Sequence, residues 1–92
     1  MADQPVTSER IRESVRAFVA KITELSPGEI SDTADFSYDL RIDSLMAIEM
    51  MVAVNKMYKI EIMDDEFRAI SNVNDAVAVV QRHLARDGGK LP

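Results

Sequence analysis

Residues 39–49 read DLRIDSLMAIE and mark the point where a long loop gives way to a helix. Ser44 stands at the start of this helix, where unpaired backbone N–H groups carry a partial positive charge. A phosphate ester is favoured at such a position. Serine is also a common helix cap, although Asp43 can fill that role instead. The local pattern therefore leaves two interpretations of Ser44 open, a modified serine and a simple cap.

The helix that begins at this serine is predicted to run to about Tyr58, because no Gly or Pro interrupts the sequence LMAIEMMVAVNKMY. We expect its inward residues to be Leu45, Ile48 and Val52, with Met51 and Val54 as further candidates. Glu49 and Lys56 cancel, so the formal charge of the helix is zero. A helix this apolar cannot bury all of its side chains on one stripe.

An amphipathic helix is predicted upstream, capped by Thr7 or Ser8 and stopped by Ser26-Pro27-Gly28. Its core-facing residues are expected to be Ile11, Val15, Phe18, Val19 and Ile22. Its solvated residues are expected to be Arg10, Arg12, Glu13, Arg16 and Lys21. The loop over residues 26–43 is long for so small a domain. We expect it to be anchored by Ile30, Phe36, Tyr38, Leu40 and Ile42.

The sequence after Tyr58 predicts a loop and two more helices. Residues 59–62 alternate in polarity but have no partner strand, so they are interpreted as loop. Asp64 is predicted to cap a short helix over residues 65–70, and Asn72 to cap the last helix, which Gly88 and Gly89 end. The core-facing residues of that last helix are expected to be Val73, Ala76, Val77, Val80 and Leu84.

These elements predict an all-α fold, a small bundle of three main helices plus one short helix, with a long loop between helices one and two. Residues 1–92 are expected to form a single domain with an ordered core over about residues 7–87 and flexible termini.

Composition excludes several functions. A net charge of −5 argues against nucleic acid and against docking on an anionic membrane. No apolar run is long enough for membrane insertion and no signal region opens the chain, so we expect a cytoplasmic protein. There is no cysteine, and the single histidine, His83, cannot form a multi-histidine metal site. No metal site or catalytic residue is predicted, and His83 is interpreted as solvated or partly packed near a helix C-terminus.

Residues 39–49 resemble the signature of acyl carrier proteins, in which an Asp-Ser-Leu triplet follows an Asp/Glu-Leu pair. The resemblance extends over roughly residues 8–86 and includes the family's order of helices. It implies that Ser44 receives 4′-phosphopantetheine from coenzyme A, with Asp43 and Leu45 completing the triplet. The protein would then be a non-enzymatic carrier of acyl thioesters in fatty-acid, polyketide or specialised lipid synthesis.

The resemblance also implies partners, namely a phosphopantetheinyl transferase and acyl-transferring, ketosynthase or ligase enzymes, visited by a monomeric carrier. We expect the partner surface to include Arg41, Met46, Glu49 and Met50. This surface should be more apolar than is usual in the family, with acidity displaced to the loop and to residues 61–66.

Arg41 departs from the family pattern, because many members have Gly at this position. A residue with a Cβ adopts positive φ less easily than Gly, so we expect the loop to turn differently and to place a cation near the phosphate. Three alternatives stay open at this stage: a peptidyl or aminoacyl carrier, an unmodified helical adaptor in which Ser44 is only a cap, and a small hydrolase that uses Ser44 and His83.

Overall fold

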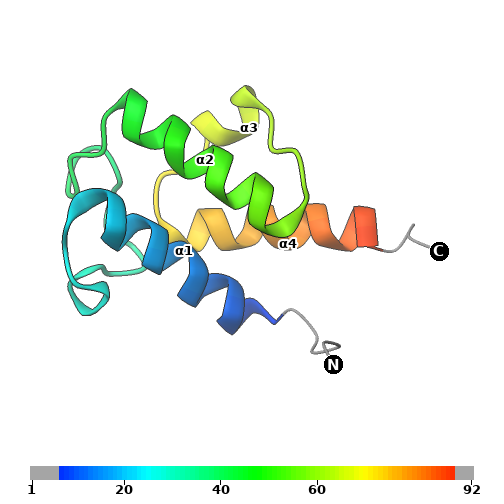
Figure 1. Cartoon of the computed structure of the whole chain (residues 1–92), viewed down its shortest axis with the longest axis horizontal. Helices are drawn as coiled ribbons and strands as arrows, with labels where there is room; N and C mark the ends of the chain where they lie inside the picture. Colours follow the sequence, from blue (N-terminus) through cyan, green and yellow to red (C-terminus); the bar gives the residue numbers. More distant parts are fainter. Residues whose placement is uncertain (1–6, 89–92) are drawn as a thin grey trace.

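The computed structural model describes residues 7–88, which form helices joined by loops, with no strand among them. The elements are α1 (Ser8–Thr23), a 3₁₀ turn η1 (Pro27–Glu29), α2 (Ser44–Tyr58), α3 (Asp64–Arg68) and α4 (Val73–Gly88), as Figure 1 shows. The predicted all-α bundle of three main helices plus one short helix is confirmed. The flexible termini predicted at residues 1–6 and 89–92, including the stop at Gly89, lie outside the described residues.

The first helix begins as predicted but ends earlier. Thr7 is its N-cap, and the Thr7 hydroxyl accepts a hydrogen bond from Arg10 N at 3.2 Å. The helix ends at Thr23, because Glu24 takes the left-handed conformation with φ 64°. Leu25 N then donates to Ala20 O at 3.1 Å, which closes the helix end without a glycine. The stop predicted at Ser26-Pro27-Gly28 is therefore misplaced.

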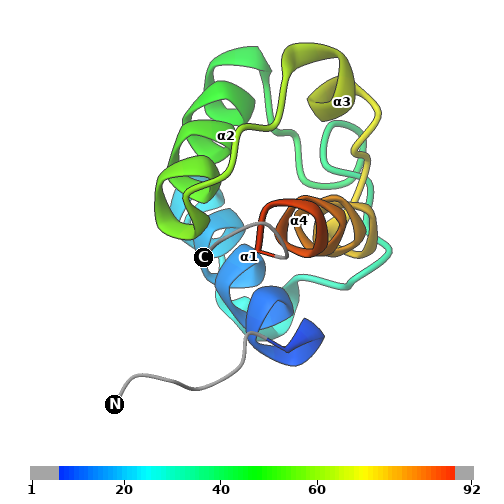
Figure 2. The ribbon, with the colours of Figure 1, turned by 90° about the vertical axis from the view of Figure 1, so that its right-hand side faces the viewer.

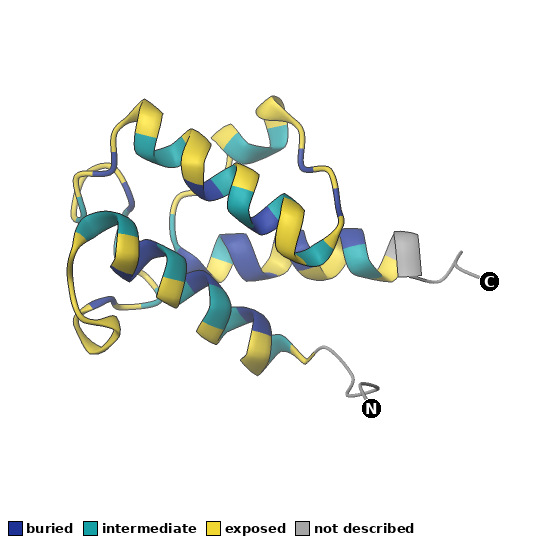
Figure 3. Cartoon of the chain, in the orientation of Figure 1, coloured by how far each residue is buried: buried dark blue, intermediate teal, exposed yellow. Residues whose placement is uncertain are grey.

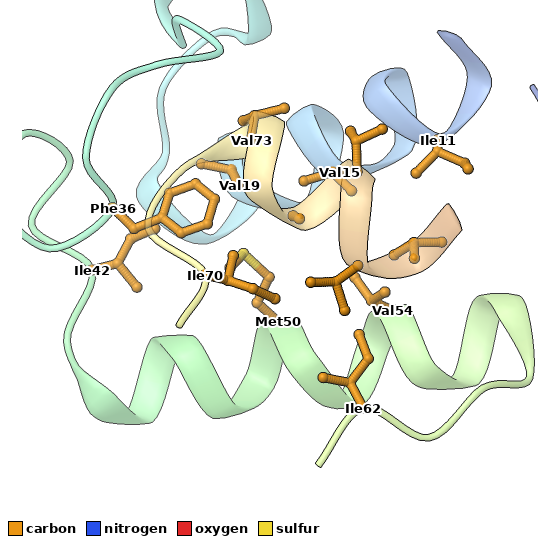
Figure 4. Close-up of a cluster of buried hydrophobic side chains, with 14 of the residues drawn as sticks. Ile11, Val15, Val19, Phe36, Ile42, Met50, Val54, Ile62, Ile70 and Val73 are labelled. Atoms are coloured by element: carbon orange, nitrogen blue, oxygen red, sulfur yellow. The ribbon is translucent and has the colours of Figure 1, made fainter. Parts of the chain in front are cut away.

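The core is formed mainly by α1 and α4, which pack against each other, while α1 also contacts α2. The predicted inward faces of α1 and α4 are confirmed by the buried residues Ile11, Val15, Val19, Val73, Ala76, Val77 and Val80. Phe18, Ile22 and Leu84 are half-buried against this core. Burying one such aliphatic side chain contributes about 1.5–3 kcal/mol. Figure 4 shows these helices contributing side chains to one cluster with Met50 of α2.

The inward face predicted for α2 is wrong for Leu45, Ile48 and Val52, whereas the candidate Val54 is confirmed as buried. Leu45, Ile48 and Val52 are 65%, 51% and 52% exposed. Exposed and buried positions alternate along α2 in Figure 3. The buried residues of α2 are Met50, 2% exposed, and Val54. The helix has apolar residues on every side, so its hydrophobic pattern does not select one face.

The loop before α2 is anchored by four of the five predicted residues. Ile30, Phe36 and Ile42 are buried, and Leu40 is half-buried. Tyr38 is 85% exposed, so its prediction as an anchor is wrong. The loop is also fixed to the segment between α3 and α4, because Phe36 N donates to Ser71 O at 2.7 Å. A long loop can hold its shape in a small domain when its apolar side chains and backbone groups are paired in this way.

Asp32 ties the same loop to α1 and α4. Its carboxylate accepts from Arg12 Nη1 at 3.1 Å and from Arg16 Nη2, and its backbone carbonyl accepts from Asn74 N at 3.1 Å. Arg12 and Arg16 are half-buried and paired, which corrects the prediction that they are simply solvated. The three segments are therefore held together at one point.

The segment from α2 to α4 has the predicted order with one different cap. Residues 59–63 form no helix or strand, and Asn55 of α2 holds them by accepting from Ile62 N at 3.0 Å. The N-cap of α3 is Met63, whose N–H donates to Glu66 Oε1 at 3.3 Å, so Asp64 is not the cap. The predicted cap of α4 is confirmed, since Asn72 Oδ1 accepts from Asp75 N at 2.8 Å.

A search for membrane spans over the described part of the chain found no helix with the length and apolarity that crossing requires.

Candidate functional site

Asp43, and not Ser44, caps α2. Asp43 Oδ1 accepts from Met46 N at 2.9 Å, and the Asp43 carbonyl accepts from Ala47 N at 2.9 Å. Ser44 is the first residue of the helix and is exposed. Its hydroxyl makes no hydrogen bond to any residue that the structure describes. The cap and the candidate modification site are therefore neighbouring but different residues.

The N-terminus of α2 also leaves room for an anion. The backbone N–H groups of Ser44 and Leu45 have no acceptor within residues 7–88, because the cap satisfies only the amides of Met46 and Ala47. Such free amides at the positive end of a helix favour a phosphate. The site is thus suited to an ester on Ser44 Oγ.

A short hydrogen-bonded turn presents Ser44. Asp39 N and Leu40 N donate to the carbonyl of Asp35 at 2.9 and 3.0 Å, and Asp35 N donates back to the Asp39 carboxylate at 2.8 Å. Ile42 N then donates to Phe36 O at 2.8 Å. These bonds fix the chain just before the helix, so the position of Ser44 follows from the loop as well as from α2.

Arg41 adopts the left-handed conformation, with φ 58°. This is the conformation that a Gly at this position would take without strain. The expectation that Arg41 makes the loop turn differently is therefore wrong. The chain makes the left-handed turn that Gly favours, and Arg41 adopts it at a cost in backbone strain. The Arg41 side chain is exposed.

A cavity of about 330 Å³ opens beside Ser44, between α2 and α3. Its inner wall consists of the buried side chains Phe36, Ile42, Met50 and Ile70. Figure 4 shows Met50 reaching from α2 toward Ile70, with Phe36 on the same side. Its polar lining residues are Ser37, Asp43, Ser44, Asp64 and Arg68. The volume lies near the lower end of the range for small-molecule pockets.

His83 is not near this site. It is 8% exposed in α4, and its Nε2 lies 2.8 and 3.0 Å from the two carboxylate oxygens of Glu66. His83 does not line the cavity beside Ser44. Because a carboxylate only accepts, Nε2 carries the proton. Of the two readings predicted for His83, solvated or partly packed, the solvated one is wrong, because the side chain is packed. The Ser44–His83 arrangement that a hydrolase needs is not assembled.

The contact with His83 changes the acidity of Glu66, whose pKa is lowered. The hydrogen bond from the His83 side chain is the main cause and holds the pKa of Glu66 below its usual value of 4.5. Burial opposes this effect, and the Met63 N–H and the charges of His83 and Arg82 reinforce it. No described group of three His, Cys, Asp or Glu side chains is placed to hold a metal ion.

The four residues predicted for the partner surface differ in how far they are exposed. Arg41 and Glu49 are exposed, and Met46 is half-buried. Met50 is in the core, so its prediction as a surface residue is wrong.

The exposed apolar side chains of α2 form a stripe that sequence reasoning missed. We call Leu45, Ile48 and Val52 the outer stripe; it begins next to Ser44. Glu49 and Lys56 lie seven residues apart and so share a face, with Val52 between them. Charged residues on one face mark it as solvated, and this signal could have identified the outer stripe.

A comparison with family models matches residues 13–80 to "Phosphopantetheine attachment site". The meromycolate extension acyl carrier protein of Mycobacterium tuberculosis is 33% identical over 78 residues, covering 85% of this chain and 68% of that protein. The polyketide-8 synthase acyl carrier protein 2 of Streptomyces avermitilis is 34% identical over 73 residues, covering 79% of this chain and 84% of that protein.

Two solved structures have the same fold. The acyl carrier protein from Enterococcus faecalis superposes with a TM-score of 0.73 at 21% identity, covering 84% of this chain and 98% of that one. The apo doublet acyl carrier protein from prodigiosin biosynthesis gives a TM-score of 0.70 at 23% identity, over 86% of this chain and 38% of that one. At these identities the likeness concerns the fold.

Proposed function

The chain belongs to the acyl carrier proteins, whose cofactor is 4′-phosphopantetheine, and on that premise we propose that the cofactor is attached at Ser44. The observation that carries the proposal is the exposed Ser44 hydroxyl at the first position of α2, left unbonded because Asp43 supplies the cap. When bound, the cofactor supplies a thiol that carries acyl groups as thioesters.

The attachment step uses the Ser44 hydroxyl as nucleophile and coenzyme A as donor. Ser44 Oγ attacks the phosphorus next to pantetheine and forms a phosphate ester. The pyrophosphate bond breaks, the adenosine bisphosphate leaves, and the serine proton passes to a base on the transferase. The free amides of Ser44 and Leu45 then lie at the helix end that favours the negative charge of the product.

The test is intact-mass measurement after incubation with coenzyme A and a phosphopantetheinyl transferase. We expect wild type to gain the mass of one arm and Ser44→Ala to gain none. Ser37 lines the same cavity and is exposed, so Ser37→Ala is the matched control and should gain the arm like wild type. A gain in Ser44→Ala, or no gain with several transferases, would favour an unmodified adaptor.

We also propose that the cavity beside Ser44 shelters part of the acyl chain. Its inner wall is apolar and includes Met50, and half-buried Met51 also lines the cavity. The flexible side chains of these two residues can repack around an acyl chain. Loading a long acyl group should shift the amide resonances of Phe36, Phe67 and Ile70. Unchanged resonances there would rule out this shelter.

The outer stripe is our candidate for the surface that partner enzymes contact. It lies beside Ser44 on a helix of zero formal charge, so partner recognition should depend on apolar burial more than on charge. Ile48 also lines the cavity, so the test uses Val52, which does not. Val52→Ser should weaken acyl transfer from an acyltransferase, a ketosynthase or an acyl ligase. The rate of transfer should change little between low and high salt, and a steep salt dependence would contradict this interpretation.

A further inference from the structure

The short helix α3 is the least fixed wall of the cavity. Phe67, Arg68 and the adjoining Ile70 line the cavity from this side. None of the residues of α3 is buried, although Ile62 before it and Ile70 after it are. Figures 1 and 2 show α3 as a single turn set between two connecting segments. A segment with so few buried side chains opens more easily than the helices around it.

One side-chain contact between α3 and α4 stands out in the described structure. Glu66 of α3 receives His83 Nε2 of α4 on both carboxylate oxygens, at 2.8 and 3.0 Å. His83 is buried, whereas Glu66 is about two-thirds buried. Glu66 also accepts from Met63 N at the start of α3. The same carboxylate therefore accepts the N–H at the start of α3 and also joins α3 to α4.

We propose that Glu66 and His83 are positioning residues that set the size of acyl chain the cavity accepts, by limiting how far α3 moves from α2. This inference rests on the proposed carrier function. Neither residue lines the cavity, so they act through Phe67 and Ile70. Holding α3 against α4 keeps the cavity near 330 Å³ and favours short chains. Longer chains require α3 to move, and that movement breaks the Glu66–His83 contact.

The first test uses the protein without its cofactor and follows hydrogen exchange in α3. The reporters are the amides of Phe67 and Ala69, which donate to Met63 O and Glu66 O. In His83→Phe we expect their exchange to rise about tenfold, the effect of losing one charge-assisted hydrogen bond. Exchange in α1 should stay unchanged. Because Gln places an amide N–H close to the position of His Nε2, His83→Gln should restore slow exchange.

Two further variants accompany His83→Phe. Glu66→Ala removes both the His83 contact and the acceptor of the Met63 N–H, so exchange in α3 should rise at least as far as in His83→Phe, and it serves if His83→Phe does not fold. Gln81→Ala, at an exposed and uncharged position of α4, is the matched control and should leave the exchange of α3 as in wild type. Equal exchange of α3 in wild type, His83→Phe and Glu66→Ala would overturn the proposal.

The second test loads the protein with a hexanoyl or a tetradecanoyl thioester and measures cleavage by hydroxylamine without any partner enzyme. Wild type should protect the hexanoyl thioester better. His83→Phe and Glu66→Ala should slow cleavage of the tetradecanoyl thioester several-fold and change the hexanoyl rate less than twofold. Equal changes for both chains would overturn size selection. Failure of wild type to load would remove the carrier proposal itself, whereas normal loading with unchanged α3 exchange would remove only the role of Glu66 and His83.

Discussion

At the scale of single residues, Asp43 caps α2 and Ser44 offers a free hydroxyl, two roles that a single serine could have filled. Asp43 satisfies the amide of Met46 through its side chain and that of Ala47 through its carbonyl. The hydroxyl of Ser44 is thereby left available, at the end of α2 where a phosphate is most favourable. A cap that is not the modified residue also means that modification need not disturb the helix.

This division predicts different stabilities for two alanine variants. Asp43→Ala should lower the free energy of unfolding by about 1 kcal/mol, the usual effect of losing a helix cap. Ser44→Ala should change it by less than about 0.5 kcal/mol, as for a surface residue without a structural contact. Urea unfolding of the two apo variants measures both. If Ser44→Ala were the more damaging change, Ser44 would be the structural cap.

Arg41 offers a second prediction at this scale. Because Arg41 has φ 58°, Arg41→Gly should stabilise the apo protein by about 1 kcal/mol, through removal of left-handed strain. Arg41→Ala keeps a Cβ and loses only the charge, so it is the control and should show no comparable gain. Thermal unfolding of both variants decides the matter: an equal gain in Arg41→Ala would assign the effect to charge.

At the scale of elements, α2 combines a core contact and a solvent-facing apolar surface in one helix. Met50 and Val54 face inward, and the outer stripe of Leu45, Ile48 and Val52 faces outward. Truncating a buried aliphatic side chain removes both its transfer free energy and its packing, whereas an exposed one loses little.

Met50→Ala should therefore lower the free energy of unfolding by about 2–5 kcal/mol. Ile48→Ala should lower it by less than about 0.5 kcal/mol, because Ile48 is half exposed at the cavity edge. Denaturant unfolding of the two variants, with Val54→Ala as a second core control, measures the difference. A larger loss from Ile48→Ala would mean that α2 packs through its other face.

The inward faces of α1 and α4 were predicted from the sequence, whereas that of α2 was not. In α1 and α4 charged residues leave a single apolar face, so Ile11, Val15 and Val73 were correctly placed in the core. The order of the helices, the cap at Asn72 and the exposed hydroxyl of Ser44 were also predicted correctly from the sequence. In α2 the apolar residues surround the helix, and its orientation follows from contacts with residues distant in sequence, such as Phe36 and Ile70.

At the scale of the whole molecule, α1, α4 and the long loop are held by many contacts, whereas α3 is held by few. α1, α4 and the loop are joined by the core and by Asp32, which binds Arg12 and Arg16. α3 depends on its flanking residues and on Glu66 and His83. His83 was not expected in this role, because the pairing joins residues seventeen positions apart and no local pattern marks it.

The Glu66–His83 contact predicts a pH dependence with a definite sign. The pKa of Glu66 is lowered in the folded state, chiefly by the hydrogen bond from His83, so Glu66 stabilises the fold above its unfolded pKa. That contribution is lost as the pH falls below about 4.5 and through the lowered folded pKa. The stability difference between wild type and Glu66→Gln should therefore shrink from about pH 5.5 to about pH 3. A difference that stays constant over this range would contradict the assignment.

The central claim is that Ser44 carries the phosphopantetheine arm, and peptide mapping after modification tests it most directly. Cleavage after Arg41 and Lys56 releases residues 42–56, a peptide in which Ser44 is the only serine. Mass spectrometry of the modified protein should place the added mass on this peptide and fragment ions should place it on Ser44. Added mass on any other peptide, or an unmodified 42–56 peptide after treatment with active transferases, would contradict the account.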